Sequence, residues 1–207
     1  MSDNTTSAAA LYVDLKRCIG CSACSLACKQ ENSVRVGQQW TKVYGAEKES
    51  YPKVGVQVLP MMCQQCGKAP CKSTCDSLGY RAIVRRPDGI LYVDPSLCVG
   101  CQKCVPVCPY AVMTFNTEKV NKLGVAGVAE KCHLCMHRLD AGLLPACVIT
   151  CQGITLEYGA FNALRAKYPN AKTMGDEVQP RVLYDNLGGE PKRPTAGYPN
   201  PVPFHED

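Results

Sequence analysis

Sixteen cysteines constrain the fold of this 207-residue chain more than any other feature. They divide into four groups of four with none left over, and every group begins with CxxC and ends with CxxxC. A shared beginning and end, with variation only in the middle, is typical of one cysteine motif that is repeated four times. In chain order the groups are Cys18, Cys21, Cys24 and Cys28; Cys63, Cys66, Cys71 and Cys75; Cys98, Cys101, Cys104 and Cys108; and Cys132, Cys135, Cys147 and Cys151.

Three kinds of cysteine chemistry compete for these groups. Disulfides fit poorly, because cysteines as close as those of Cys18–Cys28 would close very short, strained loops. Zinc is the stronger rival, but a zinc ribbon needs two separated knuckles per ion, whereas CxxCxxC packs three thiolates into one loop. The run CxxCxxCxxxCP at Cys98–Pro109 is the bacterial ferredoxin pattern, in which the fourth cysteine binds the other cluster. The sequence therefore predicts iron–sulfur chemistry, with four [4Fe–4S] clusters held by the sixteen cysteines.

The positive charge of the chain fits the same prediction. Its formal net charge is +5, and the basic residues are scattered, which argues against a nucleic-acid-binding surface. Each oxidised cubane with four thiolates contributes about −2, so four of them bring the loaded chain to about −3. We therefore expect the basic excess to balance cluster charge. Lys29 and Arg138, close to cysteines in the sequence, are candidates for tuning cluster potentials, with a solvated surface charge as the alternative.

The segment between the second and third groups predicts a β-hairpin. The β-rich runs "RAIVR" and "ILYVD" lie on either side of the turn signal Pro87-Asp88-Gly89. Because a cysteine group, a hairpin and another cysteine group follow one another in two-cluster ferredoxins, residues 56–117 are predicted to form one ferredoxin-like unit. Its clusters would be held by Cys63, Cys66, Cys71 and Cys108, and by Cys98, Cys101, Cys104 and Cys75.

The first and fourth groups then pair by elimination across this unit. Their clusters would be held by Cys18, Cys21, Cys24 and Cys151, and by Cys132, Cys135, Cys147 and Cys28. The segments "LYVDLKRC" and "GITLEYGAF" are predicted strands that flank this pair of groups. The predicted fold class is α+β, with a discontinuous ferredoxin-like unit at residues 10–55 plus 118–178 and the second unit inserted into it. His133 and His137 are predicted to be neighbours of the clusters or surface residues, not ligands.

The remaining segments carry weaker signals. Residues 179–207 are rich in Pro and Gly and are predicted to run as an extended tail, either as an arm across a partner subunit or as a loose terminus. Trp40 and Tyr44 are expected to pack over clusters, to face a partner or simply to fill the core. No run of 18 apolar residues is present, so no membrane-spanning helix is predicted. The N-terminus has neither a basic region before an apolar run nor a twin-arginine pair, so no export signal is expected.

The sequence resembles the four-cluster iron–sulfur subunit of the complex iron–sulfur molybdoenzymes, the dimethyl sulfoxide, polysulfide, thiosulfate and arsenate reductase group. The resemblance covers about residues 11–184, and all sixteen ligand positions are filled. Nitrate-reducing relatives have Trp at the position of Cys71 and hold a three-iron cluster, so Cys71 implies a full cubane. Many relatives have Pro after the fourth cysteine of several groups, whereas here only Cys108 does. The matching stretches are "VDLKRCIGCSACSLACKQEN", "MMCQQCGKAPCKSTC", "DGILYVDPSLCVGCQKCVPVCPYAVMTFN" and "KCHLCMHRLDAGLLPACVITC".

The resemblance implies an electron-transfer subunit that has no catalytic residue of its own. It would connect a large catalytic subunit, which holds a molybdenum or tungsten bis-pterin cofactor, to a quinone-linked membrane anchor subunit or another redox partner. The unit of the first and fourth groups would face the catalytic subunit, and the other unit the membrane side. The resemblance implies a periplasmic or membrane-associated protein exported with a twin-arginine partner, with a cytoplasmic location as the alternative.

Other functions stay open on the sequence alone. The chain is also compatible with a free-standing soluble polyferredoxin, or with the small subunit of a cytoplasmic hydroxyarene transhydroxylase-type molybdoenzyme. A structural protein with several zinc ions is the third alternative. Iron analysis separates this last possibility from the others, and co-purification with a large pterin-containing chain separates a docked subunit from a free carrier.

Overall fold

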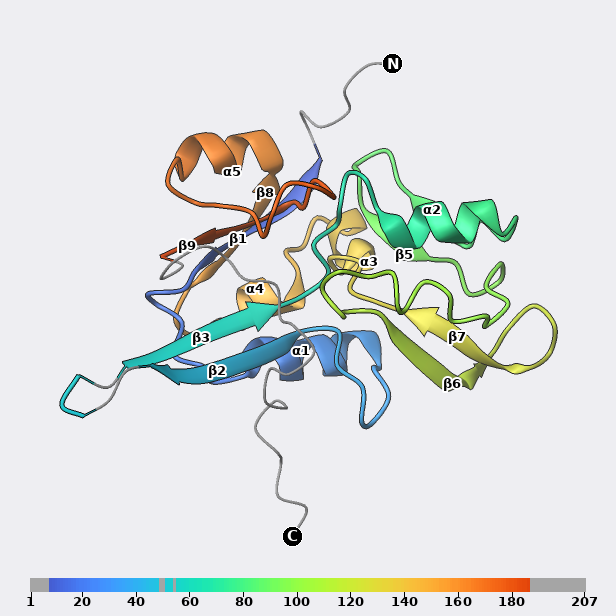
Figure 1. The fold of residues 1–207 in the computed structure, drawn as a ribbon, viewed down its shortest axis with the longest axis horizontal. Helices are drawn as coiled ribbons and strands as arrows, with labels where there is room; N and C mark the ends of the chain where they lie inside the picture. The colour runs from blue at the N-terminus through green and yellow to red at the C-terminus, as the bar shows by residue number, and fades with distance from the viewer. Residues whose placement is uncertain (1–7, 49–50, 54, 187–207) are drawn as a thin grey trace, which may run out of the picture.

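The structure is a computed structural model that describes residues 8–48, 51–53 and 55–186. Short strands and helices alternate along the chain, and the described strands form four small sheets (Figure 1). No helix in these ranges is long and apolar enough to cross a membrane. The elements are β1 (Ala9–Asp14), α1 (Ala23–Asn32), β2 (Lys42–Lys48), β3 (Gly55–Met61), α2 (Pro70–Ser77), β4 (Ile83–Arg85), β5 (Leu91–Val93), β6 (Thr114–Val120), β7 (Ala126–Glu130), α3 (Met136–Asp140), α4 (Ala146–Ile149), β8 (Leu156–Ala160), α5 (Phe161–Lys167) and β9 (Val182–Asp185).

A three-stranded sheet in the order β8-β1-β9 joins the first and last described parts of the chain. Strand β1 runs antiparallel to β8, with Leu11 opposite Tyr158, and parallel to β9, with Leu11 opposite Val182. Helix α5 covers one face, where Tyr12 stacks on Tyr168 with ring centroids 3.5 Å apart. The predicted strands in "LYVDLKRC" and "GITLEYGAF" are therefore confirmed as β1 and β8. Their pairing brings the first and fourth cysteine groups together.

The prediction of an extended tail from residue 179 is wrong for residues 179–186. Val182, Leu183 and Tyr184 form the middle of β9 and are each 1% exposed. Val182 and Tyr184 pack into the main core and Leu183 packs on the face that α5 covers, and this local signal outweighs the Pro- and Gly-rich composition of the whole segment. Residues 187–207, the rest of the predicted tail, lie outside the described part of the chain.

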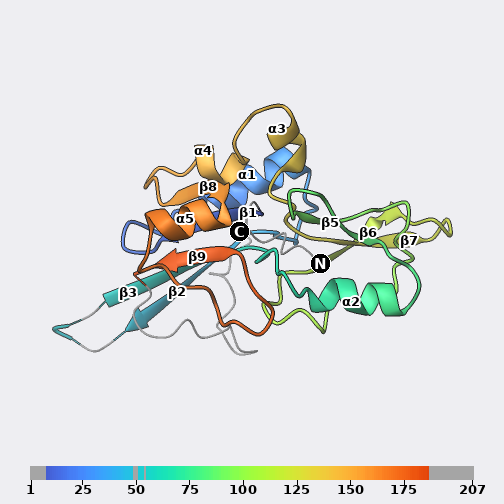
Figure 2. The ribbon, with the colours of Figure 1, turned by 90° about the horizontal axis from the view of Figure 1, so that it is seen from above.

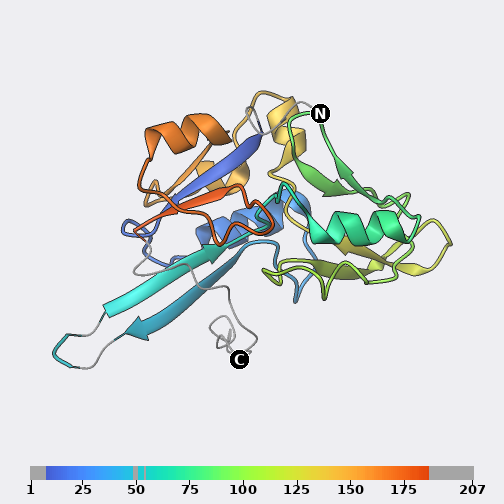
Figure 3. The same cartoon turned by 45° about the horizontal axis from the view of Figure 1, so that its top comes forward.

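Three β-hairpins surround this sheet. Strands β4 and β5 pair antiparallel across the predicted turn, where Gly89 has a φ of +82°, so the hairpin prediction is confirmed. Strands β2 and β3 form a long hairpin that projects from one end of the molecule, and the β6–β7 hairpin lies at the opposite end (Figure 3). The predicted unit boundaries at 55/56 and 117/118 fall inside β3 and β6, not between elements. The division into two ferredoxin-like units stays a prediction.

Helices α1 and α4 carry cysteines of the first and fourth groups and lie side by side (Figure 2). Helix α2 carries cysteines of the second group and starts at Pro70, whose fixed φ suits a first helical turn and places Cys71 directly behind it. Helix α1 ends at Ser33, a left-handed residue whose backbone N–H donates to the carbonyl oxygen of Lys29. Each of these helices is short, so the cysteines that it carries stay close to the loops beside it.

The core is continuous through the cysteine groups and contains few large aromatic rings. Trp40 and Tyr44 are both buried, at 6% and 8% exposure, which agrees with the core-filling alternative for these residues. The Tyr110 hydroxyl is also buried and donates to the carbonyl oxygen of Met174, 2.8 Å away. Because many cysteines contribute to the same apolar cluster, the packing of the core and the geometry of the cysteine groups depend on each other.

Candidate metal centres

All sixteen thiols are free of disulfides, and the structure gathers them into four sets. Each set combines three cysteines of one group with the last cysteine of another. The sets are called sites 1 to 4, a numbering that follows their spatial order as described below. These are the four ligand sets predicted from the sequence, and ligation itself stays a prediction. Site 1 contains Cys18, Cys21, Cys24 and Cys151; site 2 contains Cys28, Cys132, Cys135 and Cys147; site 3 contains Cys63, Cys66, Cys71 and Cys108; and site 4 contains Cys75, Cys98, Cys101 and Cys104.

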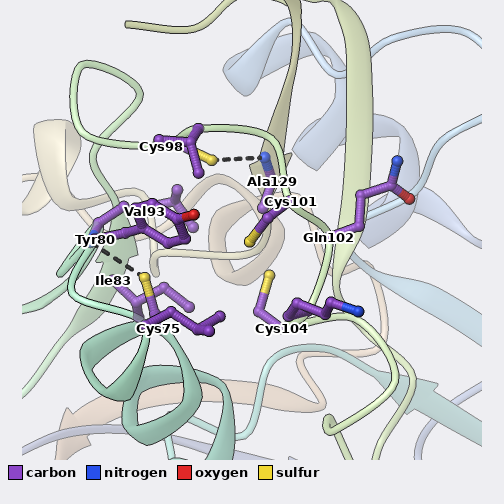
Figure 4. Close-up of a pocket in the computed structure, with 13 residues that line it drawn as sticks. Cys75, Tyr80, Ile83, Val93, Cys98, Cys101, Gln102, Cys104 and Ala129 are labelled. Atoms are coloured by element: carbon purple, nitrogen blue, oxygen red, sulfur yellow. Dashed lines mark hydrogen bonds between the residues drawn. The ribbon is translucent and has the colours of Figure 1, made fainter. Parts of the chain in front are cut away.

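The four sulfur atoms of site 4 point into one hollow of about 370 Å³, solvent at its mouth included (Figure 4). Cys75 comes from α2, and the other three cysteines come from the loop after β5. The backbone N–H of Ala82 donates to Cys75 Sγ at 3.2 Å, and that of Ala129 on β7 donates to Cys98 Sγ at 3.5 Å. Two of the four sulfur atoms of site 4 therefore each accept a hydrogen bond from a backbone N–H group.

A glycine allows the site 4 loop to approach the β6–β7 hairpin closely. Gly100 has a φ of +75°, and a Cβ atom there would lie 2.7 Å from the carbonyl oxygen of Gly127 on β7. Asn121, at the hairpin turn, accepts backbone hydrogen bonds from Leu123 and Val125 and fixes the shape of the turn. The hairpin is thus packed directly against the loop that carries Cys98, Cys101 and Cys104.

Site 1 lies around a similar hollow of about 350 Å³. Cys151 is its most hydrogen-bonded sulfur atom, with the Thr155 hydroxyl at 3.1 Å and the Thr155 backbone N–H at 3.3 Å. Burial is the largest single influence and acts to raise the pKa of Cys151, but the hydrogen bonds from Thr155, Leu156 and Gly153 together lower it. Cys21 is exposed at the surface of the molecule.

Site 2 joins the two ends of the cysteine series. The Asn32 side chain, on the last turn of α1, places its Nδ2 atom 3.7 Å from both Cys28 Sγ and Cys135 Sγ. Burial raises the pKa of Cys28 to about 11, opposed by the Thr41 side chain and reinforced by the nearby Cys135 thiol. Cys147 on α4 is buried, and its pKa is raised by burial and by the Cys135, Cys28 and Cys24 thiols.

Site 3 lies between β3 and α2. Burial raises the pKa of Cys71 to about 11, and the Cys63 and Cys108 thiols add to this effect, while the Lys131 ammonium opposes it. The pKa of Cys108 is also raised by burial, against backbone hydrogen bonds from residues 110, 112 and 113. These mutual effects place Cys108, from the third group, among cysteines of the second group.

The donor sets fit iron–sulfur cubanes. Each site brings four thiols together, those of sites 1 and 4 line a hollow, and thiolate sulfur is the ligand that such clusters require. Burial raises the pKa of Cys24 and of Cys104 to about 12, so these thiols hold their protons at neutral pH in the absence of metal. Cluster binding therefore releases protons, as is general for thiolate metal sites. A single metal ion needs its ligands closer together than a cluster does. Among the described residues, no three His, Cys, Asp or Glu side chains are close enough to hold a single ion.

The four sites form a row. The thiols of Cys24 and Cys147 interact between sites 1 and 2. The thiols of Cys63 and Cys132 interact between sites 2 and 3. The thiols of Cys71 and Cys104 interact between sites 3 and 4. These electrostatic effects between thiols give the order 1-2-3-4, which differs from the order of the cysteine groups along the chain. An exposed cysteine lies at each end of the row, Cys21 in site 1 and Cys101 in site 4.

The two histidines beside site 2 have partners that do not involve metal. The His133 ring packs edge-on against Trp40, with centroids 5.2 Å apart, and its Nδ1 atom accepts a hydrogen bond from the Met136 N–H. Burial lowers the pKa of His133 to about 4, so the ring is neutral near pH 7. His137 Nε2 lies 2.7 Å from Glu31 Oε1 at the surface. The prediction that neither histidine is a ligand remains untested by these contacts, but both rings have other roles.

The two predicted tuning cations also have structural partners. Lys29 Nζ donates to the carbonyl oxygens of Arg35 and Gln38, which holds the loop after α1. Its charge nevertheless acts to lower the pKa of Cys28, a smaller effect than burial. Arg138 binds Glu31 at 2.9 Å, so its charge is already balanced by a carboxylate. Of these two cations, Lys29 is the one whose charge acts on a described cysteine, Cys28 of site 2.

Buried cations around site 3 were missed by sequence reasoning. Lys131 and Arg181 are 2% and 7% exposed, and Arg85 is half-buried. Only one of them carries a local signal, since Lys131 directly precedes Cys132. Arg85 and Arg181 are far in sequence from the cysteines that they approach, and the hairpin and sheet bring them to the site.

Comparison with known proteins decides the family. The sequence model of the family described as "4Fe-4S dicluster domain" matches residues 54–161, half of the chain. The chain belongs to this 4Fe–4S dicluster family. The match begins one residue before β3 in the sequence and ends at the first residue of α5, so this dicluster chain has the family pattern through its second, third and fourth cysteine groups. The prediction of an iron–sulfur protein is thereby confirmed.

Relatives of this dicluster protein are named as parts of reductases. It is 41% identical over 146 residues to a tetrathionate reductase subunit of Salmonella typhimurium. The aligned region covers 70% of this chain and 54% of the relative. It is 40% identical over 149 residues to the thiosulfate reductase electron transfer subunit of Salmonella typhi, covering 70% and 72%. It is 33% identical over 209 residues to a selenate reductase subunit of Mesobacillus selenatarsenatis, covering 87% and 69%. The chain spans about half the length of its tetrathionate reductase relative.

Proposed function

We propose that this chain is the electron-transfer subunit of a molybdoenzyme reductase and carries four [4Fe–4S] clusters as a relay. The observation that carries the proposal is the row of four cysteine sets with an exposed cysteine at each end, Cys21 and Cys101. A row with accessible ends suits the passage of electrons between two partners. The names of the relatives, one of them an electron transfer subunit, support the same function.

The chain's own residues bind, separate and shield the redox groups. When bound, the clusters supply sites that accept and release single electrons. The cysteines hold them, and the apolar core around the sites excludes water, which strengthens every electrostatic effect on them. Cysteines of neighbouring sites influence one another electrostatically, which supports a relay of electrons from site to site. No residue of the chain is assigned a bond-making role, and substrate chemistry belongs to the catalytic partner.

The site 1 end has a surface suited to docking. Ile19, Ile149 and Ile154 are 69%, 57% and 70% exposed, and they flank Cys21 and Cys151 in the sequence. Exposed apolar residues beside a redox site are typical of a protein interface. By family resemblance the unit of the first and fourth groups faces the catalytic subunit, and we assign this surface to the large pterin-containing subunit.

The site 4 end has a different surface. Leu123 and Val125, at the tip of the β6–β7 hairpin, are 66% and 60% exposed. The same hairpin packs against the loop that carries Cys101, through Asn121 in its turn and Gly127 on β7. We assign this end to the second redox partner, a quinone-linked membrane anchor subunit or another electron donor or acceptor.

Co-purification tests the docked-subunit proposal. The chain is expressed with the large subunit encoded beside it, and Ile154→Glu is expected to reduce recovery of the large subunit at least tenfold, because a buried unpaired charge at an interface costs several kcal/mol. The control is Val36→Glu, a valine that is 90% exposed and lies beyond the other end of α1. A chain that never co-purifies with a large subunit, while retaining its clusters, would support the free polyferredoxin instead.

A further inference from the structure

Three cationic side chains lie near site 3: Lys131 and Arg181, which are buried, and Arg85, which is half-buried. Lys131 is 2% exposed and Arg181 is 7% exposed. Every hydrogen bond seen for these three cations in the described residues ends on a backbone carbonyl oxygen, and none ends on a carboxylate. Carbonyl oxygens satisfy the donors but leave the net positive charges unbalanced. Buried charges of this kind are retained only where a nearby group compensates them.

Lys131 lies between sites 2 and 3. Its Nζ atom donates to the carbonyl oxygen of Cys132, 3.1 Å away, and to that of Leu91. The Gln65 side chain fixes the same two residues, because its Nε2 atom donates to Cys132 O at 2.9 Å and its Oε1 atom accepts from Leu91 N at 2.8 Å. The lysine ammonium is thus held in one position, and its charge acts on Cys71 of site 3.

Arg85 contacts the loop of site 3, and Arg181 shares a hydrogen-bond acceptor with Arg85. Arg85 Nη2 donates to the carbonyl oxygens of Cys66 and Gly67, at 2.8 and 2.9 Å. Both arginines also donate to the carbonyl oxygen of Gly89, each at 3.1 Å. Burial lowers the pKa of Arg85, and the Cys66, Cys71 and Cys63 thiols act in the opposite direction. The compensating partner of these cations is therefore the metal site itself.

Other cations close by in the sequence do bind carboxylates, so the lack of a carboxylate partner is not a general feature of the cations in this part of the chain. Arg86, the next residue after Arg85, binds Asp140 with both Nη atoms, at 2.9 and 2.5 Å, and Asp88 at 3.2 Å. Lys119 binds Glu130 at 2.5 Å. These charges are balanced by carboxylates, whereas the charges of Lys131, Arg85 and Arg181 act on cysteine side chains of site 3.

We propose that Lys131, Arg85 and Arg181 form a buried cationic cradle that raises the reduction potential of the cluster at site 3. The inference rests on the proposed four-cluster function. Reduction adds one negative charge to a cluster, and fixed positive charges in a water-poor interior stabilise that added charge. The cradle also lowers the cost of placing a doubly negative oxidised cluster in the core.

The test is a redox titration of the full chain monitored by electron paramagnetic resonance, with iron content measured on the same samples. The Cys71→Ser variant identifies which signal belongs to site 3. In Lys131→Gln and Arg85→Gln, the one-electron reduction equilibrium constant of that signal is expected to fall at least tenfold, which is about 59 mV. Glutamine keeps a donor at each position, so the change isolates the charge. Arg86→Gln is the matched control and is expected to leave the signal where it is.

The possible outcomes separate the cradle from the relay. If iron content stays at the wild-type value and both variants match Arg86→Gln, the cradle is overturned and the relay stands. If the wild-type chain does not hold four clusters, the proposed function fails first. Arg85→Gln can lose iron because the loop at Cys66 and Gly67 opens when its hydrogen bonds to Arg85 are removed. In that case Lys131→Gln alone decides, because the hydrogen bonds of Lys131 end on Leu91 and Cys132 and not on that loop. A potential shift in Lys131→Gln then supports the cradle, and its absence refutes it.

Discussion

Replacing Cys151 with serine is expected to alter the same cluster signal as replacing Cys21, although the two residues are 130 positions apart in the sequence. Both sulfur atoms belong to site 1. In contrast, Cys147→Ser is expected to alter the signal that Cys28→Ser alters, because these two residues belong to site 2. Each variant should lose up to about four of about sixteen irons, the content of one cubane.

The measurement is electron paramagnetic resonance of the reduced chain, with iron content determined for each of the four variants. Serine is the conservative replacement because it keeps the side-chain volume and a possible oxygen ligand. The prediction depends on shared signals, not on the size of the loss. If Cys151→Ser and Cys147→Ser alter one common signal that Cys21→Ser leaves intact, the fourth cysteine group binds its own cluster and the exchange between groups is contradicted.

The second large effect is expected at Tyr184, in the segment whose composition predicts a tail. Tyr184→Ala removes a ring that is 1% exposed and should lower the free energy of unfolding by about 3–5 kcal/mol. The hydroxyl accepts a hydrogen bond from Gln64 Nε2 at 3.0 Å and donates to the carbonyl oxygen of Pro60 at 3.3 Å. Because Gln64 lies between Cys63 and Cys66, the variant should also lose site 3 iron at a lower urea concentration.

Tyr184→Phe is the matched control, since it keeps the ring and removes only the hydroxyl. It should cost about 0.5–1.5 kcal/mol, the usual contribution of a hydrogen bond. The urea midpoint is read from the loss of cluster absorbance, so folding and iron retention are followed together. Equal midpoints for Tyr184→Ala and the wild-type chain would mean that β9 does not contribute to the core in solution.

The part of each cysteine set that comes from a single group was predictable from the sequence because most of its spacings are local. Spacings of two and three residues between cysteines place ligands within one loop or one helical turn, and tertiary packing cannot change them. The exchange of Cys75 and Cys108 followed from the known ferredoxin pattern. The pairing of the first and fourth groups was reached only by elimination, and the β1–β8 pairing gives it a structural basis.

Strand β9 was not predictable because its partner is distant and its signal is short. Its four residues, Val182–Asp185, stand within a segment whose composition is dominated by Pro, Gly and polar residues. The parallel partner β1 lies about 170 residues earlier, as in the pairing of Leu11 with Val182. A composition average over the whole tail hides a strand of this length, and no turn signal links the two strands.

The cationic cradle was hidden for a different reason. A lysine or arginine in a sequence is most often solvent-exposed, and nothing in a single sequence marks the few that are buried. Only the fold brings Arg85 from β4, Arg181 from the start of β9 and Lys131 from the end of β7 to one site. The scattered distribution of basic residues therefore indicates charge balance, but it does not identify the residues that perform it.

Iron and sulfide analysis of the anaerobically purified full chain tests the central claim most directly. The account predicts about sixteen irons and about sixteen acid-labile sulfides per chain, as four cubanes require. Spin quantitation of the fully reduced chain should then give about four unpaired-electron equivalents, with interaction between neighbouring sites. A content of about eight irons, or zinc bound in place of iron, would contradict the four-cluster relay.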